Sequence, residues 1–501
     1  MQRRTVVKGL GAIAAAPAVG VAAGSARAAG RTADDGTLVF DPDAFTELTV
    51  AVTDTEGTAH EVVYRFHKVA SYVAKPVDVL YQSLNVSVPV TIDGTAVDAR
   101  NAPILLANSV GGYMPSSVAN KTGITATGMG GGTSRQGLAL AAGYVVVEPG
   151  ARGRTLVDQA GTYYGTAPAA IVDLKAAVRY LRFNKGRIPG NVNRIVSSGV
   201  SAGGALSCLL GASGDSPLYE PYLTAIGAAD ASDAIFATGA WCPITDLEHA
   251  DMAYEWCWGS NPLAGGALVD RTVSGELAAA YGDYVASLKL SAPGFGRLSA
   301  RNLDDYLLKT FMRPSATKYL AALPDPARET YLAAHPFITW KNGRATFTWA
   351  DFLTHVGARK KNAPSFDAFD LSTPENNLYG TGTTRARHFT LYSLRHESGD
   401  SARLDEDVPA KLHLMNPMHH LVGKANGSRS RHWWIRLGTK DTDTSHTVAG
   451  NLSARLTGLG DDVDTSYYWD AGHGADQDPA DFIRWIAAVS GHQGHRGRLG
   501  R

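Results

Sequence analysis

Cysteine is scarce in this sequence, since the 501 residues include only three. These are Cys208, Cys242 and Cys257, and an odd number this small cannot build the disulfide framework of a small secreted scaffold. One bridge between Cys242 and Cys257 is compatible with the sequence, but nothing requires it. The chain must instead be stabilised by a hydrophobic core, for which its 44% hydrophobic content is ample.

Excess charge and long apolar runs are also missing. Lysine plus arginine equals aspartate plus glutamate, at 47 each, so the formal net charge is zero. Neither this balance nor any basic cluster indicates a nucleic-acid partner. Beyond the N-terminal segment, no run reaches the roughly 18 apolar residues that a membrane-spanning helix needs, so we expect no membrane partner for the mature form.

The first 29 residues differ in composition from the rest. Arg3 and Arg4 precede a weakly hydrophobic stretch rich in alanine and glycine, and residues 26–28 (ARA) offer the small-x-small pattern of a signal-peptidase site. The paired arginines predict a twin-arginine-type signal peptide over residues 1–29, and hence a secreted protein that folds before export. An amphipathic or disordered N-terminus is the alternative.

The order of the expected elements indicates an α/β protein. Three strand-like runs separated by turn residues come first, and they are typical of antiparallel strands. Strands then alternate with helices, which predicts a mostly parallel sheet with helices on both faces. The expected strands are 48–53, 62–67, 86–92, 104–106, 143–150, 194–198, 234–241, 432–439 and 465–470, and the expected helices are 135–142, 168–183, one ending near 210, one beginning near 445, and 479–489.

This alternation stops between residues 243 and 418. The interrupting segment combines expected helices with many aromatic residues and loop signals. The simplest interpretation is one α/β domain, residues 40–242 and 419–490, that carries an inserted domain at 243–418, with a flexible tail at 491–501. Because ligands bind beyond the C-terminal ends of the strands in such sheets, we expect the insertion to be a lid over the site.

A G-x-S-x-G pentapeptide spans residues 199–203, with Ser201 at its centre. Alone it is weak evidence in a chain with 54 glycines. Its context is stronger, because a strand runs into it and a helix of small residues follows. This is the arrangement of a nucleophile elbow, in which flanking glycines permit a strained turn that exposes the serine oxygen. Ser201 is therefore the candidate nucleophile, and a purely structural serine is the alternative.

A serine nucleophile needs a base on a loop after a later strand, as in the α/β-hydrolase fold. His473 meets this condition, in a glycine-flanked loop directly after the last expected strand. The other late histidines do not, because His446 lies at an expected helix start while His492 and His495 lie in the tail. His473 is therefore the candidate base.

The base in turn needs an orienting carboxylate, which should follow the preceding strand. Asp441 and Asp443 both follow the strand at 432–439. Asp441 is nearer the strand end, and we assign it as the acid of the triad. The alternative is that one of these aspartates caps the helix beginning near Ser445.

The oxyanion formed in ester cleavage needs preorganised N–H donors. One should be the amide of Ala202, which follows the nucleophile, and the other should come from Gly111 or Gly112, in the loop after the strand at 104–106. A plain β-turn is the alternative for that loop. The glycine-rich segment 128–137 lacks the lysine of a phosphate-binding loop, so we interpret it as a flexible connection. No metal or other cofactor is expected.

Longer segments resemble the bacterial tannases, a family that hydrolyses galloyl esters. The resemblance covers residues 40 to 490, with its most specific parts in the middle of the chain. The segments are GVSAGG (199–204), ATGAWCPITDLEHADMAYEW (237–256), KNAPSFDAFDLSTPENNLYG (361–380), KDTDT (440–444) and GHG (472–474). The resemblance implies an α/β-hydrolase fold, a triad of Ser201, Asp441 and His473, and a lid domain formed by the insertion.

It also implies that Lys361, Glu375 and Asp443 bind the three hydroxyls of the galloyl ring. Two carboxylates and an ammonium can pair with three adjacent O–H groups, which both donate and accept. Without the resemblance, Lys361 would be interpreted as a solvated charge, and its neighbour Lys360 could equally face the site.

The expected function is that of a secreted serine esterase that releases gallic acid from gallate esters and hydrolysable tannins through a galloyl-enzyme. Its expected partner is a small phenolic ester. The alternatives are a feruloyl or general carboxylesterase, whose substrates lack the three-hydroxyl pattern, and a non-catalytic phenolic-binding protein. A peptidase could use the same triad, but nothing marks a propeller or a peptide-binding domain.

Overall fold

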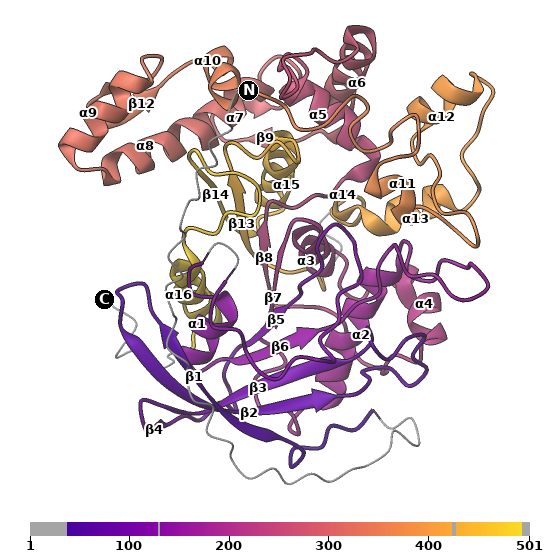
Figure 1. The fold of residues 1–501 in the computed structure, drawn as a ribbon, viewed down its shortest axis with the longest axis vertical. Coiled ribbons are helices and arrows are strands. Elements are labelled where there is room, and N and C mark those ends of the chain that lie inside the picture. The colour runs from indigo at the N-terminus through magenta and orange to yellow at the C-terminus, as the bar shows by residue number, and fades with distance from the viewer. Residues whose placement is uncertain (1–37, 129–130, 423–426, 493–501) are drawn as a thin grey trace, which may run out of the picture.

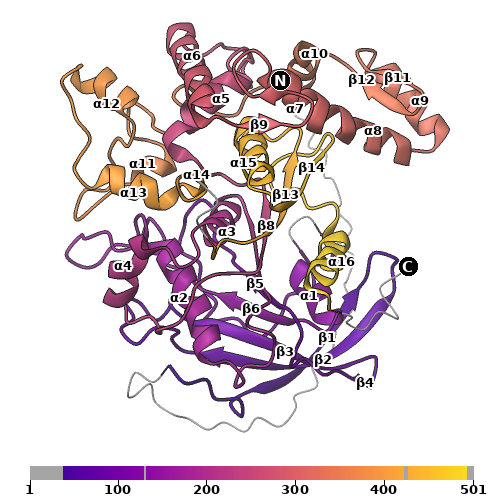
Figure 2. The same ribbon diagram turned by 180° about the vertical axis from the view of Figure 1, so that it is seen from behind.

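The computed structural model describes residues 38–128, 131–422 and 427–492, which are built around one large mixed sheet (Figures 1 and 2). The predicted signal peptide, residues 1–29, and nearly all of the predicted tail, residues 491–501, lie outside the described residues. The strands of the sheet are β1 (Thr46–Thr53), β2 (Ala59–Val69), β3 (Leu84–Ile92), β4 (Thr95–Ala96), β5 (Ile104–Ala107), β6 (Val145–Pro149), β7 (Ile195–Val200), β8 (Ala237–Trp241), β13 (His432–Gly438) and β14 (Asp462–Tyr468).

The order of the strands divides the sheet into two parts. It runs β1-β2-β3-β6-β5-β7-β8-β13-β14, with β4 paired to β3. Strands β1 to β3 pair antiparallel, and β3 also pairs antiparallel with β6. From β6 onward every pairing is parallel. The predicted α/β-hydrolase fold, with antiparallel strands first and a parallel sheet after them, is confirmed.

The sequences of the strands match their places in the sheet. In β2, buried and exposed residues alternate over most of the strand, as expected for an antiparallel strand with one face toward solvent. Strands β5, β6 and β8 are buried at every position, because helices cover both faces of the parallel part.

Helices lie on both faces of the parallel strands. A Cβ atom added to Gly211 would lie 2.2 Å from the Thr238 hydroxyl, and one added to Gly239 would lie 2.7 Å from the Phe482 ring. Since adjacent residues of a strand point to opposite faces, Gly211 and Phe482 belong to helices on opposite sides of β8. The helices that flank the sheet are α1 (Arg135–Ala141), α2 (Ala169–Phe183), α3 (Ala202–Ala212), α4 (Glu220–Ala225), α15 (His446–Gly458) and α16 (Pro479–Ser490).

Residues 243–418 form a largely helical segment between β8 and β13. In both ribbon views most of it lies at the opposite end of the molecule from β1 to β4 (Figures 1 and 2). Its elements are α5 (Ala250–Trp258), α6 (Arg271–Leu288), β9 (Ser291–Ala292), β10 (Gly296–Arg297), α7 (Leu303–Leu307), α8 (Arg313–Ala322), α9 (Asp325–Ala334), β11 (Thr339–Lys341), β12 (Arg344–Thr346), α10 (Trp349–Val356), α11 (Pro374–Leu378), α12 (Leu391–Ser398), α13 (Val408–Met415) and α14 (Pro417–His420).

The structure changes a few details of the sequence predictions. Strand β8 begins three residues later than predicted, and β14 covers Asp462–Tyr468 instead of 465–470. The three cysteines are free and buried, so the optional Cys242–Cys257 bridge is not formed. Their thiols meet different partners, with Cys242 beside His473 and Cys257 beside Ser445.

Within residues 38–128, 131–422 and 427–492, no helix combines the length and the apolar character needed to cross a bilayer.

Candidate active site

Ser201 occupies a sharp turn between β7 and α3. Its φ of 59° and ψ of −122° lie in a backbone region that residues other than glycine rarely adopt. The turn is possible because its neighbours are small. A Cβ atom on Gly199 would lie 2.2 Å from the Gly203 carbonyl oxygen, and one on Gly203 would lie 2.5 Å from Asn108 Oδ1. The pentapeptide therefore forms the strained turn that the sequence predicts.

His473 connects Ser201 to Asp441. The distance from His473 Nε2 to Ser201 Oγ is 2.9 Å, and that from His473 Nδ1 to Asp441 Oδ2 is 2.8 Å. Asp441 is fully buried, whereas a quarter of the His473 side chain (25%) is exposed. Since Asp441 accepts the Nδ1 proton, the lone pair of Nε2 is directed at the serine hydroxyl. The structure thus brings together the three residues that the sequence analysis predicts as a triad.

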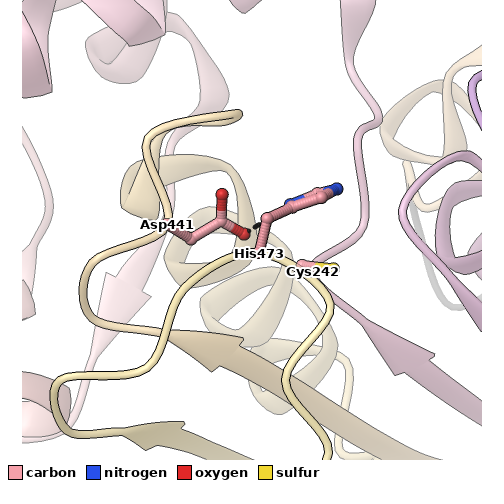
Figure 3. A group of neighbouring side chains, drawn as sticks. All are labelled: Cys242, Asp441 and His473. Carbon is pink, nitrogen blue, oxygen red and sulfur yellow. Dashed lines mark hydrogen bonds and ion pairs between the residues drawn. The ribbon is translucent and has the colours of Figure 1, made fainter. Parts of the chain in front are cut away.

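The surroundings of His473 set its charge. Burial by itself lowers the pKa of His473, but hydrogen bonds with Asp441 and Cys242 and the charge of Asp441 outweigh burial and hold the pKa above its usual value. Figure 3 shows that Asp441 and Cys242 come from separate loops and that both lie beside His473. The carboxylate thus favours the imidazolium, which is the form that a general base takes after it removes a proton.

The predicted oxyanion donors lie close to the serine turn. Ala202 is the first residue of α3, where the backbone N–H groups have no partner within the helix. The loop after β5 packs against the same turn, because a Cβ atom on Gly203 would lie 2.8 Å from the Val110 carbonyl oxygen. Gly112 follows in that loop with a φ of 54°. The loop that contains Gly111 and Gly112 is thus held next to the first turn of α3.

Arg154 ties this loop to the inserted segment. Its Nε donates to the Gly112 carbonyl oxygen at 2.8 Å, and its Nη1 donates to Asn377 Oδ1 at 2.8 Å. Asn377 lies in α11, two residues after Glu375. Sequence reasoning missed Arg154, because its two partners lie 42 and 223 residues away and no local pattern marks the link.

Helix α5 fixes the loop that carries both aspartates. The Tyr254 hydroxyl donates to the Thr442 carbonyl oxygen at 2.7 Å, and the Trp258 Nε1 donates to the Thr444 carbonyl oxygen at 2.9 Å. The two aromatic residues are four positions apart and therefore lie on one face of the helix. The loop from Asp441 to Thr444 is thus held by the inserted segment as well as by the sheet.

Asp443 lies beside the triad without belonging to its chain of hydrogen bonds. Its amide donates to Asp441 Oδ1 at 2.9 Å, and its Oδ2 is 4.0 Å from His473 Nδ1. The largely exposed Lys360 pairs with its other oxygen at 2.6 Å. Asp443 does not cap the next helix, because the Ser445 side chain accepts from the Thr447 amide there.

Lys361 lies against an aromatic ring, whereas Lys360 is largely exposed. Its ammonium lies 3.4 Å from the centre of the Phe366 ring. Burial lowers the pKa of Lys361, and the charges of Glu375 and Asp443 oppose that shift. The structure therefore brings Lys361, Glu375 and Asp443 into one electrostatic group.

Glu375 is buried with one polar atom unused. Its side chain lies in the first turn of α11, and Oε2 has no hydrogen-bond partner among the described residues. Burial raises the pKa of Glu375, while the charge of Lys361 lowers it in part. A buried carboxylate oxygen without a partner is costly, so this atom can accept a hydrogen bond that the described residues do not supply.

Two groups of side chains in the described residues could hold a metal ion. Cys242, Asp441 and His473 form one, and His335, His355 and Asp470 form the other. Cys242 was not predicted as part of the site, although it lies directly after a strand of the parallel sheet and within the segment 237–256 that carries the family resemblance.

Comparisons with known proteins agree with this geometry. A family model described as BD-FAE matches residues 123–269. The solved structure of the tannase from Fusobacterium nucleatum is 36% identical, covers 91% of this chain and all of its own, and superposes with a TM-score of 0.80. This chain belongs to the tannase family. The resemblance predicted from the sequence is thereby confirmed.

Two further tannase structures are similar over almost the whole chain. The native tannin acyl hydrolase from Lactobacillus plantarum is 35% identical, with 90% of this chain and 99% of that one covered and a TM-score of 0.77. A tannin acyl hydrolase in complex with ethyl gallate gives the same identity, coverage and TM-score. A comparison with curated proteins gives no match.

Proposed function

We propose that this protein is a carboxylic ester hydrolase that cleaves the galloyl ester bonds of gallate esters and hydrolysable tannins and releases gallic acid. The observation that carries the proposal is that the candidate triad and the residues assigned to the galloyl ring meet at one place. The hydrogen-bonded chain from Ser201 through His473 to Asp441 lies beside Asp443, whose charge also acts on Lys361. A tannase relative binds ethyl gallate, which supports the same substrate class here.

In the first half of the proposed reaction, Ser201 Oγ attacks the ester carbonyl carbon. His473 Nε2 takes the hydroxyl proton as the new C–O bond forms, and Asp441 stabilises the resulting imidazolium. The carbonyl oxygen becomes an oxyanion, which the amides of Ala202 and of Gly111 or Gly112 stabilise. When the tetrahedral intermediate collapses, His473 returns the proton to the leaving alcohol, and the galloyl group stays on Ser201.

In the second half, water replaces the alcohol. His473 Nε2 removes a proton from the water as its oxygen attacks the galloyl-enzyme carbonyl, and the same oxyanion donors act again. Collapse of this intermediate breaks the bond to Ser201 Oγ, and His473 returns the proton to the serine. Gallic acid leaves, and the protein regains its starting state. No step uses a cofactor.

The galloyl ring is proposed to bind against Lys361, Glu375 and Asp443. Its three adjacent hydroxyls can donate to the two carboxylates and accept from the ammonium. The unpaired Oε2 of Glu375 supports this role, because a ring hydroxyl would supply the donor that the protein does not. An ester whose ring lacks these hydroxyls would leave the carboxylate buried and unpaired, which gives selectivity.

Two larger features belong to the same proposal. Residues 243–418 would form a lid domain on a hydrolase domain of residues 40–242 and 419–490, since α5 and α11 from the insertion carry or hold residues of the site. Residues 1–29 would be a twin-arginine signal that exports the folded protein. Three free, buried thiols agree with folding before export, because no disulfide has to form outside the cell.

Replacement of Ser201 tests the proposal. Wild-type protein should hydrolyse methyl gallate and react covalently with a fluorophosphonate, and Ser201→Ala should do neither. Ser197→Ala is the matched control, because that hydroxyl lies in β7, the strand that leads into Ser201, is buried and has no hydrogen-bond partner among the described residues. Turnover or labelling that survives in Ser201→Ala would exclude Ser201 as the nucleophile.

A further inference from the structure

Cys242 contributes a thiol to the proposed catalytic centre that the esterase reaction does not use. It is the first residue after β8, and its amide donates to the Arg436 carbonyl oxygen at 2.7 Å. Only 2% of the residue is exposed. One ligand atom each from Cys242, Asp441 and His473 lie within 4.8 Å of one another. Figure 3 shows these three side chains together.

The three ligand types select a particular class of cation. Thiolate, imidazole and carboxylate together suit Zn²⁺ and the softer Cd²⁺, whereas Ca²⁺ and Mg²⁺ prefer sites made of oxygen atoms alone. Bonds from Zn²⁺ to these ligands are about 2.0–2.3 Å long, so tetrahedral ligand atoms lie roughly 3.5 Å apart. His473 Nδ1 and Asp441 Oδ2, now 2.8 Å apart, would have to separate by roughly 0.7 Å, while the sulfur of Cys242, within 4.8 Å of both ligand atoms, would have to approach by no more than about 1.3 Å.

We propose that Cys242, Asp441 and His473 form a binding site for a soft divalent cation, and that the bound cation switches the esterase off. The thiol of Cys242 loses its proton to solvent as the sulfur bonds to the cation. His473 donates its Nδ1 lone pair, while the proton formerly on Nδ1 is carried on Nε2. Asp441 supplies a carboxylate oxygen, and the two negative ligands neutralise the charge of the cation.

Inhibition follows from the tautomer that the cation imposes. With Nδ1 bonded to the cation and Nε2 protonated, His473 has no lone pair to take the proton of Ser201. This consequence rests on the proposed serine mechanism, whereas binding of the cation does not. A chelator should restore activity, because only reversible proton transfers and coordinate bonds are involved, and Cys242 regains its proton from solvent when the cation leaves.

The second group of candidate ligands is less suited to a cation. Asp470 already bonds Tyr331, His355 and Lys440, and the ammonium of Lys440 would have to leave before a cation could enter. A cation there would also leave His473 free to act. His355→Ala therefore serves as a control that reports on any effect of this second group.

Binding is tested first with Cd²⁺, because a bond between thiolate and cadmium adds an ultraviolet absorption band. Wild-type protein and Ser201→Ala should both show the band at one equivalent of Cd²⁺. Cys242→Ala should lose the band and bind Cd²⁺ about 100-fold more weakly or worse, whereas Cys208→Ala, which removes a buried thiol elsewhere, should keep both. A band that persists in Cys242→Ala, or its absence from the wild type, would overturn the proposal.

Inhibition is tested with Zn²⁺ on methyl gallate hydrolysis, where each variant is compared with its own metal-free rate. Wild-type protein and His355→Ala should lose most of their activity and regain it with a chelator, and Cys242→Ala should keep the same rate with and without Zn²⁺. Equal sensitivity of wild type and Cys242→Ala would refute the switch. If wild-type protein binds Cd²⁺ but has no esterase activity without metal, the proposed function fails while the metal site stands.

Discussion

The candidate active site has two sides, which differ in how their polar atoms are paired. The triad side is Ser201, His473 and Asp441, and the ring side is the group proposed to bind the galloyl ring, Lys361, Glu375 and Asp443. On the triad side, Ser201, His473 and Asp441 satisfy one another within hydrogen-bond distance before any substrate arrives. On the ring side, Glu375 Oε2 has no hydrogen-bond partner among the described residues, and Lys361 rests on an aromatic ring. The hydrogen bonds of the triad are complete in the free protein, whereas a buried carboxylate oxygen on the ring side, Glu375 Oε2, has no partner among the described residues.

This difference indicates that the triad side sets the rate of ester cleavage, whereas the ring side sets which ester is preferred. A preorganised triad costs no rearrangement when the oxyanion forms, so it would act on any ester that reaches it. The open polar atoms gain partners only from a ligand that brings hydroxyl groups to them. Changes on the triad side should therefore lower the rate for all esters, and changes on the ring side should alter the preference among esters.

The largest effect is expected from Asp441→Asn. The amide can donate a hydrogen bond to His473 Nδ1, which favours the tautomer that cannot accept the serine proton, and kcat should fall about 10⁴-fold. The loss should be similar for methyl gallate and methyl benzoate, as measured by steady-state hydrolysis. A loss confined to methyl gallate would place Asp441 on the ring side and would refute the assignment of rate and ester preference to separate sides.

Glu375→Gln should come next and should act on one substrate only. The exchange keeps the shape of the side chain but removes the charge that a ring hydroxyl would bind, so kcat/KM for methyl gallate should fall about 100-fold. For methyl benzoate, kcat/KM should change by no more than about threefold. Parallel losses for both esters would show that Glu375 does not select the ring.

A smaller effect is expected from Tyr254→Phe, which acts on both sides. The hydroxyl donates to Thr442 and accepts from the amides of Lys360 and Lys361, so its loss frees the aspartate loop and the lysine segment together. We expect kcat/KM for methyl gallate to fall about tenfold, with the phenyl ring still filling its place in the core. Wild-type kinetics in this variant would show that the hydroxyl positions neither segment.

The smallest effect concerns pH. His473 must be neutral to act as the base, so kcat/KM should fall as pH decreases through its raised pKa. Asp443 lies 4.0 Å from His473 Nδ1, and its negative charge favours the imidazolium. Asp443→Asn should therefore lower the pKa of His473 by less than about one unit and move the acid limb of the kcat/KM profile to lower pH, measured with methyl benzoate, whose ring has no hydroxyl for Asp443 to bind. A shift to higher pH would contradict this sign.

Local patterns were enough to predict that Ser201, His473 and Asp441 lie together. A strand, a turn of small residues and a helix mark Ser201, and a strand followed by a glycine-flanked loop marks His473. The choice of Asp441 over Asp443 depended only on distance from the strand end, and the structure adds the reason. Asp441 is the aspartate within hydrogen-bond distance of His473, while Ser445 caps the helix in place of Asp443.

The ring side could not be derived from local patterns. Lys361 lies in a basic triplet that is typical of a solvated surface, and its distinction from Lys360 depends on Phe366, which lies against Lys361, and on Asp443, which pairs with Lys360. The contact with Asp443, like those of Arg154, joins segments far apart in the chain. Only the family resemblance pointed to Lys361 and Glu375 before the structure was known.

The most direct test of the division is the ratio of kcat/KM for methyl gallate to that for methyl benzoate, measured in wild-type protein, Ser201→Ala and Glu375→Gln. The account predicts a ratio of about 100 or more in the wild type, no turnover of either ester in Ser201→Ala, and a ratio close to one in Glu375→Gln. A wild-type ratio near one, or turnover of methyl gallate by Ser201→Ala, would contradict it.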